Sequence, residues 1–546
     1  MAVLTAIIDR YYRTWFRFYP GVAVDAGVEG YAHILQPYGD DELNALKVLN
    51  EKLISSLDEL NIDSLSQDQQ IDLQLMRSSA VLQLEAQALR DWRTTEPTRF
   101  LPVHAIYQLT VHDIDDKALA FRERLAAIPH HLRGARSWLD IEPEKIPLIW
   151  LESAVAEAQG GAEFFRELKQ HPEIIAYRIS EELELAAHAL DDFAVYLQSE
   201  LADKAKGDFA CGEKYFNLIL QEGHFLNINA DELYHFGEQL FQKTEEELKQ
   251  ETQKLQGNDD VESLLNSIRK QHPGKENLLS EYRQQMIAAR NFIKDNDIVS
   301  MPAKESLAVI ETPVFLQHQI PFAAYYEPAA TDAKQQAYYY VTPPQTDDEL
   351  GEHNSIAIKH TCVHEAWPGH HLQFVTANLT SSSCTLPRLL NPSATLYEGW
   401  ALYCEQLMHE LGFIEEKESR IVLLKDRLWR ALRIMIDVAI HTRGLTLDAA
   451  AQLMQDKLGF SKNQAMGDLT WYTQAPGVPM SYATGWAIIN ELKTKQQEKD
   501  GFDLKAFHDT LLSSGSIALP LAVVRGFGLP EWEEIHSAVF KKVNLR

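Results

Sequence analysis

The sequence predicts a mainly α-helical protein that carries one small β-sheet. Apolar residues recur at intervals of three and four along most of the 546 residues, which is the period of an amphipathic helix. Only residues 307–313 and 336–342 have the β-branched and aromatic composition of strands. Hydrophobic residues make up 45% and charged residues 24% of the chain, so its composition is that of an ordinary globular protein.

Residues 1–205 are predicted to form an N-terminal helical lobe. Helical periodicity runs through three of its segments: residues 43–60, 68–92 and 117–139. The sequence Ala-Lys-Gly-Asp at residues 205–208 marks a boundary. Residues 206–546 are predicted to form a second lobe, continuous with the first. A long helix over residues 231–255 opens this lobe, because Asn229 precedes an acidic first turn.

The two predicted strands lie just ahead of a histidine-rich segment. A sheet edge at this place could bind an extended peptide by strand addition. Alternatively, the strands form a structural hairpin that covers the core. The sequence leaves both interpretations open.

Residues 362–371, with the sequence CVHEAWPGHH, contain the clearest candidate for a metal site. His364 and Glu365 form the His-Glu pair of zinc hydrolases, in which a second histidine normally follows four residues after the first. Here that position is Pro368, so the motif is not a regular one.

Pro368 and Gly369 disfavour a regular helix at this point. A widened, bulged turn is therefore predicted, which would bring His370 to the position that the second histidine normally takes. The predicted ligands are His364 and His370, with His371 as the alternative second ligand.

The third ligand is predicted to be Glu398, at the start of the helical sequence LYEGWALYCEQL over residues 396–407. Two histidines and one glutamate leave a fourth position open, which is the arrangement of a hydrolytic zinc site. Glu365 is then the general base that takes a proton from water. The structural alternative is a buried helix with satisfied histidines and a capping glutamate.

These residues also carry a family resemblance. HEAWPGHHLQ at residues 364–373, followed by LYEGWALY at 396–403, resembles the bacterial family known as domain of unknown function 885. Three further segments fit it: residues 433–441, 476–485 and 507–509. That family is regarded as zinc peptidases related in architecture to helical gluzincins such as oligopeptidases and carboxypeptidases. The resemblance covers at least residues 210–530.

The resemblance implies a large helical gluzincin-like architecture, with the small sheet beside a deep cleft and Zn²⁺ bound between helices. The second lobe is then the catalytic, metal-binding lobe, and the reaction is hydrolysis of peptide bonds in short peptides by a metal-activated water. A non-peptide amide hydrolase is an alternative within the same class. A non-catalytic metal- or peptide-binding protein with a degenerate site is an alternative from another class.

The resemblance also implies roles for residues outside the motif. Arg433, Asp437 and His441 are spaced by four and share one helix face, which in isolation is an ion-pair ladder. Beside a cleft, Asp437 and Arg433 are expected to support the ligands, with Asp437 orienting a histidine. His441 is expected to contact substrate or the oxyanion, and the phenol of Tyr482 to donate to the oxyanion.

Charge and cysteine usage limit the partners and the compartment. The net charge of −28 argues against nucleic acid and anionic membranes as partners, because phosphate binding needs basic patches. No run of 18 apolar residues predicts a membrane span. The first ten residues lack a basic leader, and the four cysteines form no C-x-x-C pair, so a reduced, cytoplasmic protein is predicted. Monomer and homodimer both stay open.

Overall fold

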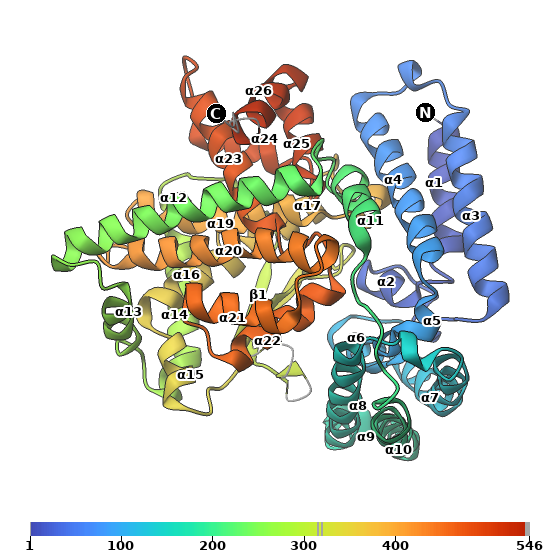
Figure 1. Ribbon diagram of the computed structural model, residues 1–546. Coiled ribbons are helices and arrows are strands. Elements are labelled where there is room, and N and C mark those ends of the chain that lie inside the picture. Colours follow the sequence, from blue (N-terminus) through green and yellow to red (C-terminus); the bar gives the residue numbers. More distant parts are fainter. Residues whose placement is uncertain (1, 314–315, 318–319, 321, 541–546) are drawn as a thin grey trace.

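The computed structural model describes residues 2–313, 316–317, 320 and 322–540. These residues form a mainly helical molecule with one three-stranded sheet (Figure 1). The prediction of a mainly α fold with a small sheet is therefore confirmed. Among the helices of the described part of the chain, none is both long enough and apolar enough to cross a membrane.

The first ten helices form the N-terminal side of the molecule (Figure 1). Their bounds are α1 Ala2–Trp15, α2 Pro20–Asp25, α3 Asp40–Asp58, α4 Gln67–Leu89, α5 Trp92–Thr95, α6 Val103–Val111, α7 Lys117–Leu139, α8 Leu148–Leu168, α9 Pro172–Tyr177 and α10 Ser180–Tyr196. The start of α4 shows how the local sequence sets these bounds. The side chain of Ser66 accepts a hydrogen bond from the backbone N–H of Gln69, whose side-chain oxygen accepts one from the backbone N–H of Ser66.

The remaining helices and the sheet form the larger part. The helices ahead of the sheet are α11 Gly212–Leu218, α12 Ala230–Gln256, α13 Val261–Arg269 and α14 Leu278–Asp295. Those after it are α15 Asp347–Glu352, α16 Ser355–Glu365, α17 His370–Leu379, α18 Leu386–Leu389, α19 Ala394–Glu410, α20 Ser419–Thr442, α21 Leu447–Leu458, α22 Lys462–Gln474, α23 Ser481–Gln497, α24 Leu504–Leu512, α25 Leu519–Phe527 and α26 Leu529–Phe540. The predicted helix over 231–255 corresponds to α12, which begins with the predicted cap at Asn229.

The sheet contains β1 Ser306–Glu311, β2 Ala323–Tyr326 and β3 Gln336–Val341, in the order β1-β3-β2. β1 runs parallel to β3, with Ser306 opposite Gln336. β2 runs antiparallel to β3, with Ala323 opposite Val341. The sequence predicted β1 and β3 but not β2, because four residues are too few to show an alternating pattern. β2 is nevertheless an edge strand, and this matters for the site.

Three apolar clusters make up the interior. One comprises helices α1, α3 and α4, a second consists of residues between 92 and 205 together with Tyr340, and the third and largest joins α11–α14, the sheet and the C-terminal helices. Tyr340 of β3 belongs to the second cluster, so the sheet packs against N-terminal helices as well. The division of the chain at residue 205 stays a prediction.

Two glycines let α19 and α23 approach each other backbone to backbone. A methyl group added to Gly399 of α19 would lie 2.5 Å from Cα of Gly485, and one added to Gly485 of α23 would lie 2.0 Å from the carbonyl oxygen of Thr395. No side chain fits at either position. The contact therefore fixes the relative position of the main-chain segments that carry Glu398, next to Gly399, and Tyr482, one turn before Gly485.

Candidate metal centre

Three residues from three helices form a cluster of metal-ligating type. His364 lies in the last turn of α16, His370 begins α17, and Glu398 lies near the start of α19. One ligand atom from each lies within 4.8 Å of the others, and all three residues are buried. These are the two histidines and the glutamate that the sequence pattern indicated.

The chain reaches this arrangement through a helix break, not through the bulged turn that the sequence predicted. α16 ends at Glu365, four residues follow without helical structure, and α17 begins at His370. The N–H of Gly369 donates to the carbonyl of Val363 at 3.0 Å, which folds the connection back on α16. A methyl group on Gly369 would lie 1.8 Å from the carbonyl oxygen of His364, so only glycine fits there.

The break is held from two sides. The indole N–H of Trp400, two residues after Glu398, donates to the carbonyl of Pro368 at 2.8 Å. The indole N–H of Trp367 donates to Glu305 at 2.9 Å. Both tryptophans therefore fix the connection that carries His370.

The distances within the cluster and an unpaired carboxylate oxygen fit a bound metal ion. Nε2 of His364 and Nε2 of His370 each lie 3.4 Å from Oε2 of Glu398. Ligands at about 2.0–2.1 Å from a tetrahedral zinc ion are separated by about 3.3–3.4 Å. Oε2 of Glu398 is buried and makes no hydrogen bond to any described residue. Because buried polar atoms are normally paired, the donor set fits a cation.

Glu405, on the same helix as Glu398, supports the first histidine. Its Oε1 lies 2.7 Å from Nδ1 of His364, and its side chain is buried. Nη2 of Arg430 lies 3.9 Å from the same oxygen. A carboxylate behind a ligating histidine fixes its ring and makes it a better donor. Asp437 was predicted to take such a role, and the structure places Glu405 there instead.

Electrostatic interactions within the cluster are strong. Burial lowers the pKa of His364, but the nearby carboxylates of Glu398 and Glu405 outweigh burial and raise this pKa to about 10. Burial raises the pKa of Glu398, but His370 and His364 lower it well below its usual value. The cluster therefore pairs the carboxylate of Glu398 with a cationic His364, and a metal ion would take the place of the proton on that histidine.

Glu365 and Tyr482 lie beside the cluster. Burial raises the pKa of Glu365. His364 and His370 lower this pKa, but the carboxylates of Glu398 and Glu405 raise it, and the net shift is upward. Burial also raises the pKa of Tyr482 well above its usual value, and the nearby carboxylate of Glu398 contributes. Tyr482 is therefore a neutral phenol, able to donate a hydrogen bond.

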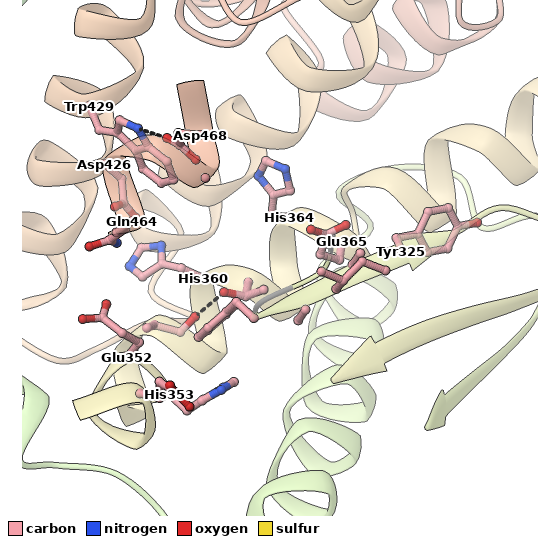
Figure 2. Close-up of a pocket in the computed structure, with 18 of the residues that line it drawn as sticks. Tyr325, Glu352, His353, His360, His364, Glu365, Asp426, Trp429, Gln464 and Asp468 are labelled. Atoms are coloured by element: carbon pink, nitrogen blue, oxygen red, sulfur yellow. Dashed lines mark hydrogen bonds between the residues drawn. The ribbon is translucent and has the colours of Figure 1, made fainter. Parts of the chain in front are cut away.

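The cluster opens into a cavity of about 1910 Å³ that is lined by the sheet edge, by N-terminal helices and by α20 and α22. In Figure 2, His364 and Glu365 lie between Tyr325 of β2 on one side and the hydrogen-bonded pair of Trp429 and Asp468 on the other. All four residues of β2 line the cavity. The deep cleft that the family resemblance implied corresponds to this cavity.

His371, the alternative ligand, points away from the cluster. Its Nε2 lies 3.0 Å from Glu305 and its Nδ1 lies 3.2 Å from the hydroxyl of Tyr325. Both ring nitrogens are therefore already used. The sequence could not separate His370 from His371, because the direction of α17 depends on the break before it.

His441 and Asp437 lie outside the cavity lining among the described residues. Nε2 of His441 lies 3.0 Å from the carbonyl of Tyr472, and burial lowers its pKa to about 4. Asp437 accepts backbone N–H groups of Gly477 at 3.1 Å and Met480 at 3.3 Å. Its carboxyl therefore holds the loop that leads into α23 and Tyr482, and it contacts none of the cluster histidines.

Arg433 does line the cavity, beside Tyr482 and not beside the cluster histidines. Its guanidinium lies over the ring of Tyr482, with 4.8 Å between Cζ and the ring centroid. Of the ladder of Arg433, Asp437 and His441, only the first residue therefore reaches the cavity.

Sequence reasoning missed Glu405, Glu305 and Tyr325. A signal for Glu405 exists, because seven residues separate it from Glu398 and residues seven apart share a helix face. Glu305 and Tyr325 carry no such signal. They lie far from the motif in the sequence and reach it only through the packing of the sheet.

Two solved structures share this fold over nearly the whole chain. A protein from Shewanella oneidensis, named a lipoprotein of unknown function, has a TM-score of 0.76 at 21% identity, over 95% of this chain and 98% of that chain. A protein from Colwellia psychrerythraea, also named a lipoprotein, has a TM-score of 0.80 at 16% identity, over 99% of each chain. At these identities the likeness concerns the fold alone.

No curated protein matches the chain. A family model does, and its match extends from residue 20 to residue 526. It includes all residues of the cluster and the glycines that position them. The match thus bears out the resemblance that the two motifs carried, and the chain belongs to the family of bacterial proteins of unknown function DUF885.

Proposed function

We propose that this protein is a zinc-dependent hydrolase that cleaves peptide bonds of short peptides. The observation that carries the proposal is the buried cluster of His364, His370 and Glu398 in the wall of a large cavity. Two histidines and a carboxylate with an open fourth position are the ligand set of catalytic zinc. Glu365 follows the first histidine directly, as the general base does in zinc hydrolases.

Zinc, when bound, would polarise the scissile carbonyl and acidify water. Glu365 accepts the proton of the attacking water and later gives it to the leaving amine. Tyr482 donates a hydrogen bond to the oxygen that gains charge as the carbonyl is attacked. Glu405 keeps the ring of His364 in place during these steps.

The cavity and the sheet edge favour a peptide substrate over a small amide. A cavity of about 1910 Å³ exceeds the size of roughly 300–1,000 Å³ that suits a drug-sized molecule. β2 pairs with β3 on one side only, and its residues line the cavity. An extended peptide can therefore add to β2 as a further strand, with main-chain hydrogen bonds that hold any sequence.

We also propose that the protein is located in the cytoplasm. Reduced cysteines favour the cytoplasm, and all four cysteines are free, with Cys384 exposed. The lipoprotein names of the two similar structures favour the cell envelope instead. Fractionation of the source cells followed by immunodetection decides between them. Recovery with the soluble cytoplasmic proteins supports our proposal, and recovery with membranes overturns it.

Metal analysis tests the ligand assignment first. We expect about one zinc per chain after dialysis, and its loss in His364→Ala, His370→Ala and Glu398→Ala. His371→Ala is the matched control, because this neighbouring histidine is already bonded to Glu305. Full metal content in the first three variants would remove the proposed site.

Activity of zinc-loaded protein on a mixed peptide library tests the reaction. Glu365→Gln should keep the metal and the fold but lose about 10²–10⁴ in rate, because glutamine cannot accept the proton. If the zinc-loaded wild type hydrolyses small amides but no peptides, the alternative amide hydrolase is correct. If it hydrolyses neither, the protein is a non-catalytic binder.

A further inference from the structure

An arginine with unused donors lies in the cavity wall next to the proposed catalytic residues. Arg433 of α20 is nearly buried, with 8% of its side-chain surface exposed, and it lines the cavity together with Tyr482 and Glu398. A buried charge is costly unless it is paired, so the partners of Arg433 indicate its role.

Those partners hold the guanidinium firmly but leave one edge free. Its Nε donates to the hydroxyl of Tyr472 at 2.8 Å, and its Nη2 lies 3.7 Å from Asp468. The oxygen of Asp468 nearest to Arg433 accepts hydrogen bonds from Trp429 and Tyr472 instead. Within the described part of the chain, the two Nη atoms of Arg433 make no hydrogen bond.

Aromatic rings fix the plane of this guanidinium. Its Cζ lies 4.1 Å from the ring centroid of Trp429, 4.8 Å from that of Tyr482 and 5.5 Å from that of Trp471. Cation–π contacts stabilise an arginine without using its N–H groups. The side chain is therefore preorganised, and its Nη donors stay available to a ligand.

A second arginine, Arg430, lies one turn earlier on the same face of α20 and also lines the cavity. Its Nε is buried and has no hydrogen-bond partner among the described residues. Its ion pairs are long, at 3.9 Å to Glu405 and 3.8 Å to Asp426. Two neighbouring arginines with incomplete hydrogen bonding point to an anionic group that enters from the cavity.

We propose that Arg433, assisted by Arg430, binds the C-terminal carboxylate of the substrate, so that the protein removes residues from the C-terminal ends of peptides. This inference rests on the proposed peptide hydrolysis and names its substrate class. A planar guanidinium group binds a carboxylate through two parallel hydrogen bonds. The neutral amide groups elsewhere in a peptide cannot form this charged pair.

The position of Arg433 selects the last peptide bond. Its guanidinium packs on Tyr482, which lies beside Glu398, and one extended residue spans only about 3.3–3.6 Å. In the proposed complex, a carboxylate held there belongs to the residue that follows the carbonyl under attack. Water adds to that carbonyl carbon, the C–N bond breaks, and the leaving nitrogen takes a proton. The products are a shortened peptide and a free amino acid.

The test on wild-type protein compares three forms of each peptide: the free acid, the C-terminal amide and the N-acetylated free acid. We expect release of the last residue from both free acids, and at least a 100-fold lower kcat/KM for the amide. Cleavage of amide and free acid at equal rates, or at internal bonds, would overturn the inference while the proposed peptidase stands. If the protein neither binds zinc nor hydrolyses any peptide, both the proposed peptidase function and the inferred carboxylate site are wrong.

Variants of Arg433 test whether this residue causes the preference for free-acid peptides. Arg433→Gln should reduce kcat/KM about 100-fold for the free acid and little for the amide, and Arg433→Lys should recover part of it. Arg427→Gln is the matched control, because Arg427 lies on the same helix but contacts Glu247 and Trp486 outside the cavity lining. Equal losses on both substrates would show a structural role instead.

Binding provides a readout that does not depend on turnover. Calorimetry of the zinc-loaded Glu365→Gln protein should give a free-acid peptide an affinity at least tenfold above that of its amide. This preference should disappear in the Glu365→Gln, Arg433→Gln double variant. Persistence of the preference in the double variant would exclude Arg433 as the carboxylate site.

Discussion

At the scale of single residues, the hydroxyl of Tyr482 offers the sharpest test of the proposed chemistry. Tyr482→Phe removes only the donor, so turnover should fall about 100-fold with little change in KM, because the contact strengthens as the oxygen gains charge. Steady-state kinetics on one peptide measures the change. Tyr234→Phe, on α12 beside Arg443, is the control. A main effect on KM would make Tyr482 a ground-state contact.

Glu405 is a positioning residue, and its effect should appear in metal affinity. Glu405→Gln keeps the shape but weakens the acceptor for His364, so zinc affinity should fall about 10- to 100-fold. Competition with a chelator of known affinity measures it. Glu410→Gln, on the same helix but bonded to Lys493 and Gln406, should change nothing. Unchanged affinity in both variants would remove Glu405 from the support of the site.

The local sequence indicated the residues of the cluster, but not their supports. His364, Glu365 and Glu398 stand in short motifs whose chemistry is readable from residue type and spacing. The supporting contacts of Glu305 and Tyr325 arise between distant segments. Spacing along the chain carries no information about such contacts, because they depend on how helices and strands pack.

At the scale of elements, the break between α16 and α17 shows where periodic reasoning stops. Pro368 and Gly369 correctly marked a departure from a regular helix. Whether the helix bulges or ends there depends on partners such as Trp400, whose indole holds the connection from another helix. The second strand, β2, was missed for a similar reason, since its pairing with β3 and not its composition makes it a strand.

The contact between α19 and α23 should be intolerant of added volume. Gly485→Ala places a methyl group 2.0 Å from the carbonyl oxygen of Thr395, so we expect a loss of about 1–3 kcal/mol in the free energy of unfolding. Denaturant titration measures it. Gly467→Ala, in α22, is the matched control. A methyl group there meets nothing within 4 Å, and the change should stabilise by about 0.5–1 kcal/mol. Equal stability of the two variants would contradict the close approach.

At the scale of the whole molecule, metal binding and folding should be linked. The three ligands come from three helices of the largest apolar cluster, and the unfolded chain has no preformed site. Zinc at 100 times its dissociation constant should therefore raise the free energy of unfolding by about 2.7 kcal/mol.

The expected dependence on zinc can be measured with and without a chelator in the same denaturant titration. His370→Ala should show no response to zinc, whereas His371→Ala should respond like the wild type. A response of equal size in His370→Ala would place the bound zinc elsewhere.

The helical class and the small sheet follow from composition and period, because these are properties of each segment. The cavity cannot be predicted from composition and period, because its wall joins Asp25 of α2, the edge strand and helices near the C-terminal end. Such a wall exists only once the chain is assembled. The sequence therefore predicted which residues form the cluster better than it predicted the shape of the cavity.

The glycine contact between α19 and α23 has a consequence for how this site tolerates change. Elsewhere in a core, side chains shift to absorb a substitution, but between Gly399 and Gly485 there is no side chain to shift. The separation between the main-chain segments that carry Glu398 and Tyr482 is thus set by a backbone contact, and a shift of neighbouring side chains cannot restore it. A displacement of about 1 Å in an active site can cost about 100-fold in rate. The same backbone contact therefore positions the two helices accurately and makes their alignment sensitive to any added volume.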